Sequence, residues 1–219
     1  MSDQPPTVTT ALGAVRGFRD DGVDCYRGIP YARPPVGELR FQPPQPPALW
    51  EGVVQATEFG PISLQDVDPL PMAVPGAESA FYRPGTTTGE DCLSLNIWAP
   101  AGPGPHPVLF WIHGGAFLCG SGSGEWIDGA SFARRGVMVV TINYRLGVLG
   151  WTDLRQVIPD AVNLGLRDQI AALQWVHNHI AAFGGDPNRV TIAGESAGAM
   201  STCALLACNE AEGLFARAI

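Results

Sequence analysis

Residues 191–201 read TIAGESAGAMS, and Ser196 lies at the centre of a G-x-S-x-G pattern within them. This pattern is typical of a serine held on a sharp turn between a strand and a helix, where the hydroxyl can act as a nucleophile. The apolar residues 190–193 precede it, and residues 199–208, rich in small side chains, follow it. The expected context is therefore present, and a buried serine at a glycine-rich helix start is the weaker alternative.

A second candidate motif, WIHGGAF, occupies residues 111–117. It follows the apolar stretch 107–112, which suits a buried strand. A loop of this type supplies backbone amides that stabilise a developing oxyanion in known hydrolases. A plain turn at a strand end is the alternative for this motif. Two such motifs in this order, each after an apolar strand, favour acyl transfer.

The elements that must position these motifs alternate between strand and helix from residue 93 onward. Such alternation predicts a parallel sheet with crossover helices, and residues 7–30 predict a short antiparallel meander before it. Residues 163–183 have apolar side chains at helical spacing and stop at Gly184-Gly185-Asp186-Pro187. The expected elements are strands at 93–100, 107–114, 137–144 and 189–194, and helices at 125–136, 163–183 and 196–208.

A nucleophilic serine needs a histidine to take its proton, and the four histidines make poor candidates. His113 precedes the second motif and is expected to orient it. His177 and His179 are two residues apart on a predicted helix, so they face different directions and do not suit a metal pair. His106 lies among prolines in a predicted surface loop. None of the four is therefore a credible base.

Taken together, the motifs of this chain resemble those of the type B carboxylesterase and cholinesterase family of α/β-hydrolases. The matching stretches run almost from end to end and in the family's order. They are residues 28–32 (GIPYA), 39–41 (LRF), 90–93 (EDCL), 113–117 (HGGAF), 143–147 (NYRLG), 163–169 (NLGLRDQ), 183–187 (FGGDP) and 194–198 (GESAG).

The resemblance implies an α/β-hydrolase fold, with a central mostly parallel sheet, flanking helices and a small N-terminal antiparallel meander. Residues 1–219 would be the N-terminal part of one such domain. Ser196 would be the acylated nucleophile, and Glu195 an acidic neighbour that tunes the site electrostatically. The oxyanion hole would be formed at Gly114, Gly115, Ala116 and Ala197, with Gly114 shaping the turn and the other three donating backbone amides.

The resemblance also implies two structural ion pairs, Arg40 with Glu90 and Arg145 with Asp168. Secreted members of the family carry a disulfide from the cysteine that matches Cys92 to one in the preceding loop. Here that loop reads GPISLQ over residues 60–65, with a serine where the partner would lie. Cys92 is therefore predicted to be a free thiol.

A preference for choline esters is not expected. No tryptophan occurs between Trp50 and Trp98, where a quaternary ammonium group would need an aromatic face. Phe81 or Tyr82 could substitute for this tryptophan.

The base is expected beyond Ile219. In α/β-hydrolases the order along the chain is serine, then acid, then histidine. The residues after Ser196 include Glu210 and Glu212 but no histidine, and residues 213–219 resemble the start of a further strand. The sequence therefore predicts the N-terminal portion of a longer esterase, with this portion nearly inactive alone and poorly soluble.

Three other interpretations remain open at this stage. The first is a non-catalytic binding or adhesion relative of the same fold, although such relatives usually lose the serine or its glycines, which are intact here. The second is an inactive fragment, and the third is a short protein whose partner chain supplies the histidine. Within the esterase interpretation (EC 3.1.1 class), the motifs do not separate carboxylester, lactone and amide hydrolysis.

Composition limits the partners. The 219 residues carry a formal net charge of −8 and no run of Lys or Arg, which argues against nucleic acid and anionic membranes. No apolar stretch has the length of a signal peptide or a membrane span. Five cysteines without a C-x-x-C pattern suggest reduced thiols and a cytoplasmic protein. We expect a small-molecule ester substrate, no cofactor and no metal; the oligomeric state stays open.

Overall fold

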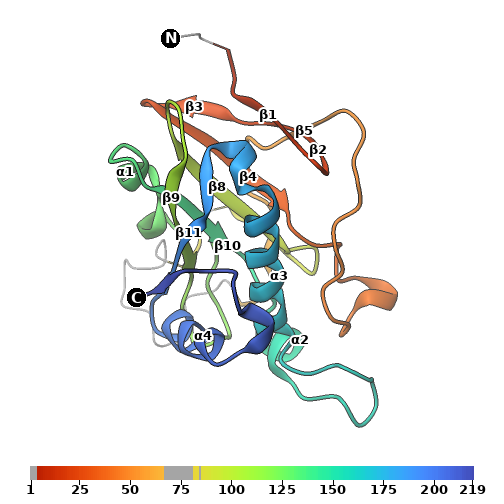
Figure 1. Cartoon of the computed structure of the whole chain (residues 1–219). Coiled ribbons are helices and arrows are strands. Elements are labelled where there is room, and N and C mark those ends of the chain that lie inside the picture. The colour runs from red at the N-terminus through yellow and green to blue at the C-terminus, as the bar shows by residue number, and fades with distance from the viewer. Residues whose placement is uncertain (1–3, 67–80, 84) are drawn as a thin grey trace.

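A seven-stranded sheet runs through the part of the chain that the structure describes. The structure is a computed structural model, and it describes residues 4–66, 81–83 and 85–219 (Figure 1). The strand order in this sheet is β12-β11-β9-β10-β8-β4-β3. The strands are β3 Phe18–Asp20, β4 Val23–Pro30, β8 Ser94–Pro100, β9 His106–Ile112, β10 Met138–Ile142, β11 Gly185–Gly194 and β12 Arg217–Ala218.

The sheet is mixed because its two halves are connected differently. Strands β10, β9, β11 and β12 pair in parallel, whereas β8, β4 and β3 join them in antiparallel pairs. Parallel neighbours need crossover connections, which contain α1 (Ala130–Ala133), α3 (Leu164–His179) and α4 (Ala197–Leu206). The predicted parallel sheet with crossover helices is confirmed for this half, and the N-terminal antiparallel strands continue the same sheet.

Two smaller sheets lie beside the main one. β1 (Thr7–Thr10) and β2 (Gly13–Arg16) form an antiparallel hairpin within the predicted meander of residues 7–30, and β5 (Val53–Gln55) pairs in parallel with β2. Trp50 fastens the preceding proline-rich segment, since its indole nitrogen donates to the carbonyl of Ala14 at 3.0 Å. β6 (Ile62–Ser63) and β7 (Thr88–Gly89) form a two-stranded parallel pair.

The helices differ from the sequence predictions mainly in length. Residues 163–183 were predicted as one helix, but α3 ends at His179 and a 3-10 turn, Ile180–Phe183, completes the segment before the left-handed Gly184. The helix predicted at 125–136 is reduced to a 3-10 turn, Glu125–Ile127, and the single turn of α1. A short helix that the sequence did not predict, α2 (Gly147–Trp151), follows β10.

The core lies on both faces of the sheet. Met138 and Val140 of β10 point to the face covered by α3, where Leu173 and Val176 are fully buried. Val139, between them, points to the opposite face and packs in a smaller cluster that includes Ala133 of α1. This burial on two faces explains why β10 is continuously apolar in sequence. On the other side of β9, the parallel register of β9 with β11 brings the carboxyl ends of these two strands together.

Candidate active site

Ser196 occupies the turn between β11 and α4, as the pattern around it predicts. Its backbone has φ 52° and ψ −117°, a conformation that residues other than glycine rarely adopt. Such a residue costs about 1 to 3 kcal/mol and persists only where its surroundings enforce it. Ser196 is also exposed. The strained turn therefore presents the hydroxyl to solvent at the carboxyl end of β11.

The glycines of the G-x-S-x-G pattern allow this turn to close. A Cβ added at Gly198 would overlap the carbonyl oxygen of Ile112, the last residue of β9. A Cβ added at Gly194 would overlap the backbone of Gly198 and lie 2.8 Å from the same oxygen. Strand β9, strand β11 and helix α4 therefore meet so closely that neither position tolerates a side chain.

The loop after β9 lies directly against Ser196. Gly194 pairs with Ile112 in the sheet, so the two strands end side by side. A Cβ at Gly114 would lie 3.1 Å from the Cβ of Ser196 and 2.7 Å from the carbonyl oxygen of Glu195. The structure thus brings the two sequence motifs together, although they are about 80 residues apart.

Among the backbone amides here that have no hydrogen-bond acceptor in the described residues are those of Gly115, Ala116 and Ala197. Ala197 is the first residue of α4, where the helix leaves its amides unpaired and its dipole favours negative charge. The backbone turns through positive φ at Gly115 (106°), Ala116 (55°) and Phe117 (62°). A run of donors free of protein acceptors beside an exposed hydroxyl can stabilise an oxyanion that forms on an attacked carbonyl.

His113 holds this loop in place. Its ring makes no hydrogen bond to the Ser196 hydroxyl among the described residues. Its Nδ1 lies 2.8 Å from the carbonyl oxygen of Gly114, and its ring stacks on Tyr144 with centroids 4.4 Å apart. The Tyr144 hydroxyl donates to the carbonyl of His113 at 2.8 Å. Burial lowers the pKa of His113 to about 4, so the ring is neutral at pH 7. This agrees with the orienting role expected from the sequence.

The other histidines lie at the far end of the sheet. His106 begins β9, whereas the site lies at the opposite end of that strand. α3 begins near the site, since Gly165 packs against Trp151, and His177 and His179 fall in its last turn. Among the described residues, no hydrogen bond joins a histidine side chain to the Ser196 hydroxyl. All four histidines belong to the described part of the chain.

Aromatic residues outside the two motifs also shape the site. The ring of Phe117 packs on Trp151 of α2 at 4.2 Å, and Trp151 meets Tyr144 edge-on at 6.4 Å. The carbonyl of Phe117 accepts a hydrogen bond from the amide of Gly147 at 2.7 Å. Sequence analysis missed Trp151 because α2 is too short for a periodic apolar pattern.

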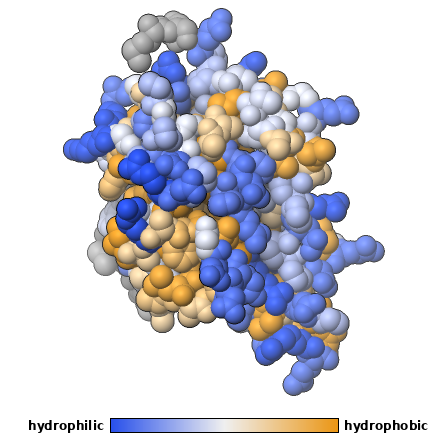
Figure 2. Space-filling model, viewed as in Figure 1, coloured by the Kyte–Doolittle hydropathy of each residue, from blue (hydrophilic) through white to orange (hydrophobic). Residues whose placement is uncertain are grey.

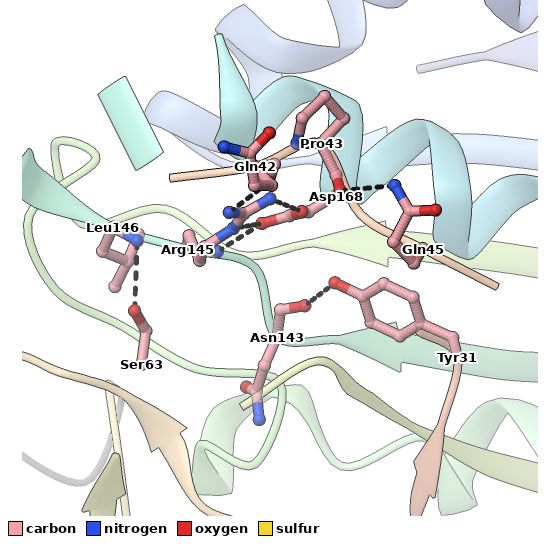
Figure 3. Close-up of polar contacts among 9 residues, drawn as sticks. All are labelled: Tyr31, Gln42, Pro43, Gln45, Ser63, Asn143, Arg145, Leu146 and Asp168. Atoms are coloured by element: carbon pink, nitrogen blue, oxygen red, sulfur yellow. Dashed lines mark hydrogen bonds and ion pairs between the residues drawn. The ribbon is translucent and has the colours of Figure 1, made fainter. Parts of the chain in front are cut away.

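The segment after β10 carries the buried ion pair that the resemblance implied (Figure 3). Arg145 binds the Asp168 carboxylate through Nη2 at 2.6 Å and Nε at 2.8 Å, and its amide donates to Asp168 at 3.1 Å. Nη1 donates to the carbonyl of Gln42 at 2.8 Å. Burial lowers the pKa of Arg145, but the bonds and charge of Asp168 outweigh it and raise that pKa. The second implied pair, Arg40 with Glu90, is also present, with Nε and Oε2 2.8 Å apart.

Cys92 is a free, fully buried thiol, as predicted. Burial raises the pKa of the Cys92 thiol to about 12, and the nearby Ser63 side chain acts in the opposite direction. Ser63 therefore lies where the family's partner cysteine was expected.

No group of three His, Cys, Asp or Glu side chains within residues 4–66, 81–83 and 85–219 could hold a metal ion. Over the same ranges, no helix is long and apolar enough to cross a membrane.

Apolar side chains gather on the surface over α4 and the C-terminal segment, in the lower left of Figure 2. Met200 and Leu206 of α4 and Ile219 at the end of the chain are 61% to 82% exposed. β12, beside them, pairs only with β11 among the described strands, so its other edge is open. This face borders the turn that carries Ser196.

Known proteins match this chain along nearly its whole length. The model of the "Carboxylesterase family" matches residues 4–219. A para-nitrobenzyl esterase of Bacillus subtilis is 49% identical over 217 residues, which cover 97% of this chain and 42% of that protein. A cholinesterase of Mus musculus is 44% identical, with 97% of this chain and 36% of that protein covered.

Solved structures give the same result. A thermophilic PNB esterase superposes with a TM-score of 0.90 at 48% identity, covering 98% of this chain and 44% of the other. A Geobacillus stearothermophilus carboxylesterase superposes with a TM-score of 0.85 at 50% identity, and the match covers 97% of this chain and 42% of the other. The chain thus has the α/β-hydrolase fold and spans about two fifths of the length of these relatives.

Proposed function

We propose, from the premise that this chain belongs to the carboxylesterase family, that Ser196 is the nucleophile of a serine hydrolase that cleaves carboxylic esters. The observation that carries the proposal is the strained, exposed serine beside three amides without a protein acceptor. A structural serine has no need of such a backbone, which survives only because Gly194 and Gly198 let β9, β11 and α4 close around it.

In the proposed reaction, Ser196 Oγ bonds to the ester carbonyl carbon while a general base takes the hydroxyl proton. The carbonyl oxygen becomes negative and accepts hydrogen bonds from the amides of Gly115, Ala116 and Ala197, with Gly114 shaping the turn. Collapse of this intermediate expels the alcohol, which takes the proton, and leaves an acyl-serine. Water then repeats the sequence and releases the acid. Each positioned donor is worth about 3 to 4 kcal/mol in the transition state.

The general base is proposed to come from outside these 219 residues, together with the acid that orients it. His113 is buried, neutral and bonded to Gly114, and the other three histidines lie at the opposite end of the sheet. A histidine from elsewhere in the gene product or from a partner chain would have to approach Ser196 across the exposed side of the turn. The carboxylate of Glu195, whose Oε2 lies beside Gly114, would add negative charge near an imidazolium.

We also propose that residues 1–219 form the N-terminal part of a single α/β-hydrolase domain. Two observations support this: the short share of the relatives that the chain covers, and the apolar surface over α4 beside the open edge of β12. Polypeptide that added a strand to this edge would cover that surface.

The substrate is proposed to be a small-molecule ester. The relatives are named as esterases of several kinds, including para-nitrobenzyl esterase, fumonisin B1 esterase and cholinesterase, so the names support the ester bond and not one acid or alcohol. We further propose a cytoplasmic location, supported by the free cysteines, and no role for nucleic acid or membrane, supported by the net charge of −8.

The test is stopped-flow hydrolysis of p-nitrophenyl butyrate by the native gene product, with Ser196→Ala and Ser131→Ala variants. Ser131 is an exposed serine on α1 and serves as the matched control. We expect a burst of nitrophenol in the wild type and in Ser131→Ala, and none in Ser196→Ala. A native product that folds but neither hydrolyses esters nor acylates Ser196 would make the chain a non-catalytic relative.

The same assay tests the source of the base. Residues 1–219 produced alone should hydrolyse the ester at least about a thousandfold more slowly than the native product, as when a triad member is removed. Equal, Ser196-dependent rates would place the base among the four histidines of this chain and contradict the proposal.

A further inference from the structure

Gln65 lies outside both catalytic motifs but holds the loop that carries the oxyanion donors. The amide of Gly120 donates to Gln65 Oε1 at 2.7 Å, and Gln65 Nε2 donates to the carbonyl of Gly120 at 2.9 Å. The same Nε2 donates to the carbonyl of Ser63 at 3.0 Å. One side-chain amide thus fixes both polar groups of Gly120 and ties them to the segment 61–65.

Gly120 in turn packs against the beginning of the oxyanion loop. Its φ is +105°, and a Cβ at this position would lie 2.5 Å from both the carbonyl oxygen of Gly114 and Nδ1 of His113. Gly120 therefore lies so near Gly114 and His113 that no side chain fits between them. The contacts run from Gln65 through Gly120 to Gly114, which lies beside Ser196.

The segment 61–65 is itself anchored to the core. The backbone that carries Gln65 is therefore held in place. The amide of Leu146 donates to Ser63 Oγ at 3.1 Å, as Figure 3 shows. The side-chain amide of Asn143 donates to the carbonyl of Pro61 at 3.2 Å. Both partners belong to the segment after β10, next to the buried pair of Arg145 and Asp168.

The oxyanion loop has internal bonds at its centre. The carbonyl of Gly115 accepts hydrogen bonds from the amides of Leu118 and Cys119 at 2.9 and 3.0 Å, and the Cys119 thiol donates to it at 3.4 Å. These bonds set the curvature of the loop. They do not set its position relative to the body of the protein. Two polar contacts join the loop to the body: the Phe117 carbonyl accepts from the Gly147 amide at 2.7 Å, and Gln65 binds Gly120 at the exit of the loop.

We propose that Gln65 is a positioning residue that sets the distance of the oxyanion donors from Ser196, an inference that rests on the proposed function. Substrate contact is not part of this role. Gln65 acts through Gly120 and Gly114, and its loss leaves the donors present but displaced. A displacement of about 1 Å can cost a factor of about 100 in rate, even when substrate binding is unchanged.

The competing explanation is that Gln65 only fastens residues 61–65 to the loop and adds to overall stability. The two explanations predict different kinetics for labelling by a fluorophosphonate, whose phosphoryl oxygen takes the place of the oxyanion. Displaced donors lower the limiting rate constant of labelling and leave the inhibition constant and the final stoichiometry unchanged. Lost stability lowers the stoichiometry, because part of the protein is unfolded, and leaves the rate of the folded part unchanged.

The experiment compares Gln65→Met and Gln65→Glu with wild type in the native gene product. Met keeps the length of the side chain without polar atoms, and Glu keeps the acceptor for the Gly120 amide but faces two carbonyl oxygens with a carboxylate. The matched control is Gln55→Met, since Gln55 is exposed on β5 and its side-chain amide donates to the local carbonyl of Val53 at 3.2 Å. We expect both Gln65 variants to label about 10- to 100-fold more slowly at saturation, with full stoichiometry, and the control to stay within about twofold.

Hydrogen exchange of residues 114–120, followed by mass spectrometry, is the second measurement and needs no activity. We expect residues 114–120 to exchange faster than in wild type in both Gln65 variants, and at the wild-type rate in the Gln55→Met control. Unchanged limiting rates, or reduced stoichiometry with unchanged exchange, would overturn the role of Gln65. If wild type is not labelled at Ser196, the proposed function fails instead, and the exchange result alone then decides whether Gln65 holds the loop.

Discussion

Two groups of polar residues lie beyond the carboxyl ends of parallel strands of the main sheet, one around Ser196 after β11 and the other around Arg145 after β10, with β9 between the two strands. Around Arg145, guanidinium and carboxylate are almost completely buried and bonded to each other, to Gln42 and to the local backbone. Around Ser196, the backbone is strained, the hydroxyl is exposed and three amides lack a protein acceptor. The first region satisfies its polar groups within the protein, and the second leaves them available for a ligand.

The difference separates structural from chemical roles. Substitutions near Arg145 should change the free energy of unfolding, because they leave buried charge without a partner. Substitutions near Ser196 should change reactivity with little loss of stability, or even a gain.

Asp168→Asn should have the largest effect. It leaves the buried Arg145 without a counter-charge, which costs about 3 to 5 kcal/mol of unfolding free energy. Urea denaturation followed by fluorescence measures the loss. The double variant Arg145→Met/Asp168→Leu is the control and should lose less than Asp168→Asn, because no unpaired charge remains. If Asp168→Asn lost less than about 1 kcal/mol of unfolding free energy, the polar groups around Arg145 would not depend on this ion pair, contrary to the comparison.

His113→Asn should remove a pH dependence of stability. Burial holds the pKa of His113 near 4 in the folded chain, against 6.5 for the ordinary side chain. Below pH 6.5 the unfolded chain therefore binds a proton that the folded chain does not, and stability falls as the pH drops toward 4. Between pH 7 and pH 4.5 this amounts to about 2 to 3 kcal/mol.

The measurement is urea denaturation of wild type and His113→Asn at both pH values. The carboxylates titrate in both proteins, so their contribution cancels in the difference. An equal fall in stability for the two proteins would mean that His113 is protonated in the fold, contrary to its buried position on Tyr144.

Ser196→Gly should stabilise the protein while abolishing acylation. Glycine adopts φ 52° and ψ −117° without the steric cost that serine bears, and the gain exceeds the entropy cost of glycine by about 1 kcal/mol. Ser196→Ala keeps the Cβ and should not show this gain. Thermal and urea unfolding of both variants gives the comparison, and a glycine variant no more stable than the alanine variant would contradict the strain.

Glu90→Gln should have the smallest effect, below about 1 kcal/mol. Its partner Arg40 is 48% exposed, and exposed ion pairs contribute little because water screens them. The contrast with Asp168→Asn then depends on burial alone. A loss comparable to that of Asp168→Asn would mean that the 39–41 segment depends on this pair for its position.

Much of the site could be predicted from local sequence, because local sterics build it. The small residues around Ser196 and Gly114 are forced by backbone atoms that lie too close for a Cβ, and such constraints appear in sequence as short glycine motifs. Strands with continuous apolar runs, such as β9 and β10, could also be predicted from local sequence.

Gln65, Tyr144 and Trp151 could not be assigned roles from the sequence. Gln65 lies 55 residues before its partner Gly120, and a side-chain-to-backbone bond of this kind leaves no pattern in the sequence. Trp151 and Tyr144 act through ring contacts that depend on where the short helix α2 packs. The mixed character of the sheet was likewise set by long-range pairing of β8 with β10 and β4.

The central claim is that the strained serine and the three amides without protein acceptors form one acylation site. A crystal structure of the native gene product after treatment with a fluorophosphonate tests it most directly. The account predicts phosphorus bonded to Ser196 Oγ and the phosphoryl oxygen about 2.7 to 3.1 Å from the amides of Gly115, Ala116 and Ala197. An adduct on another residue, or a phosphoryl oxygen turned away from these amides, would contradict it.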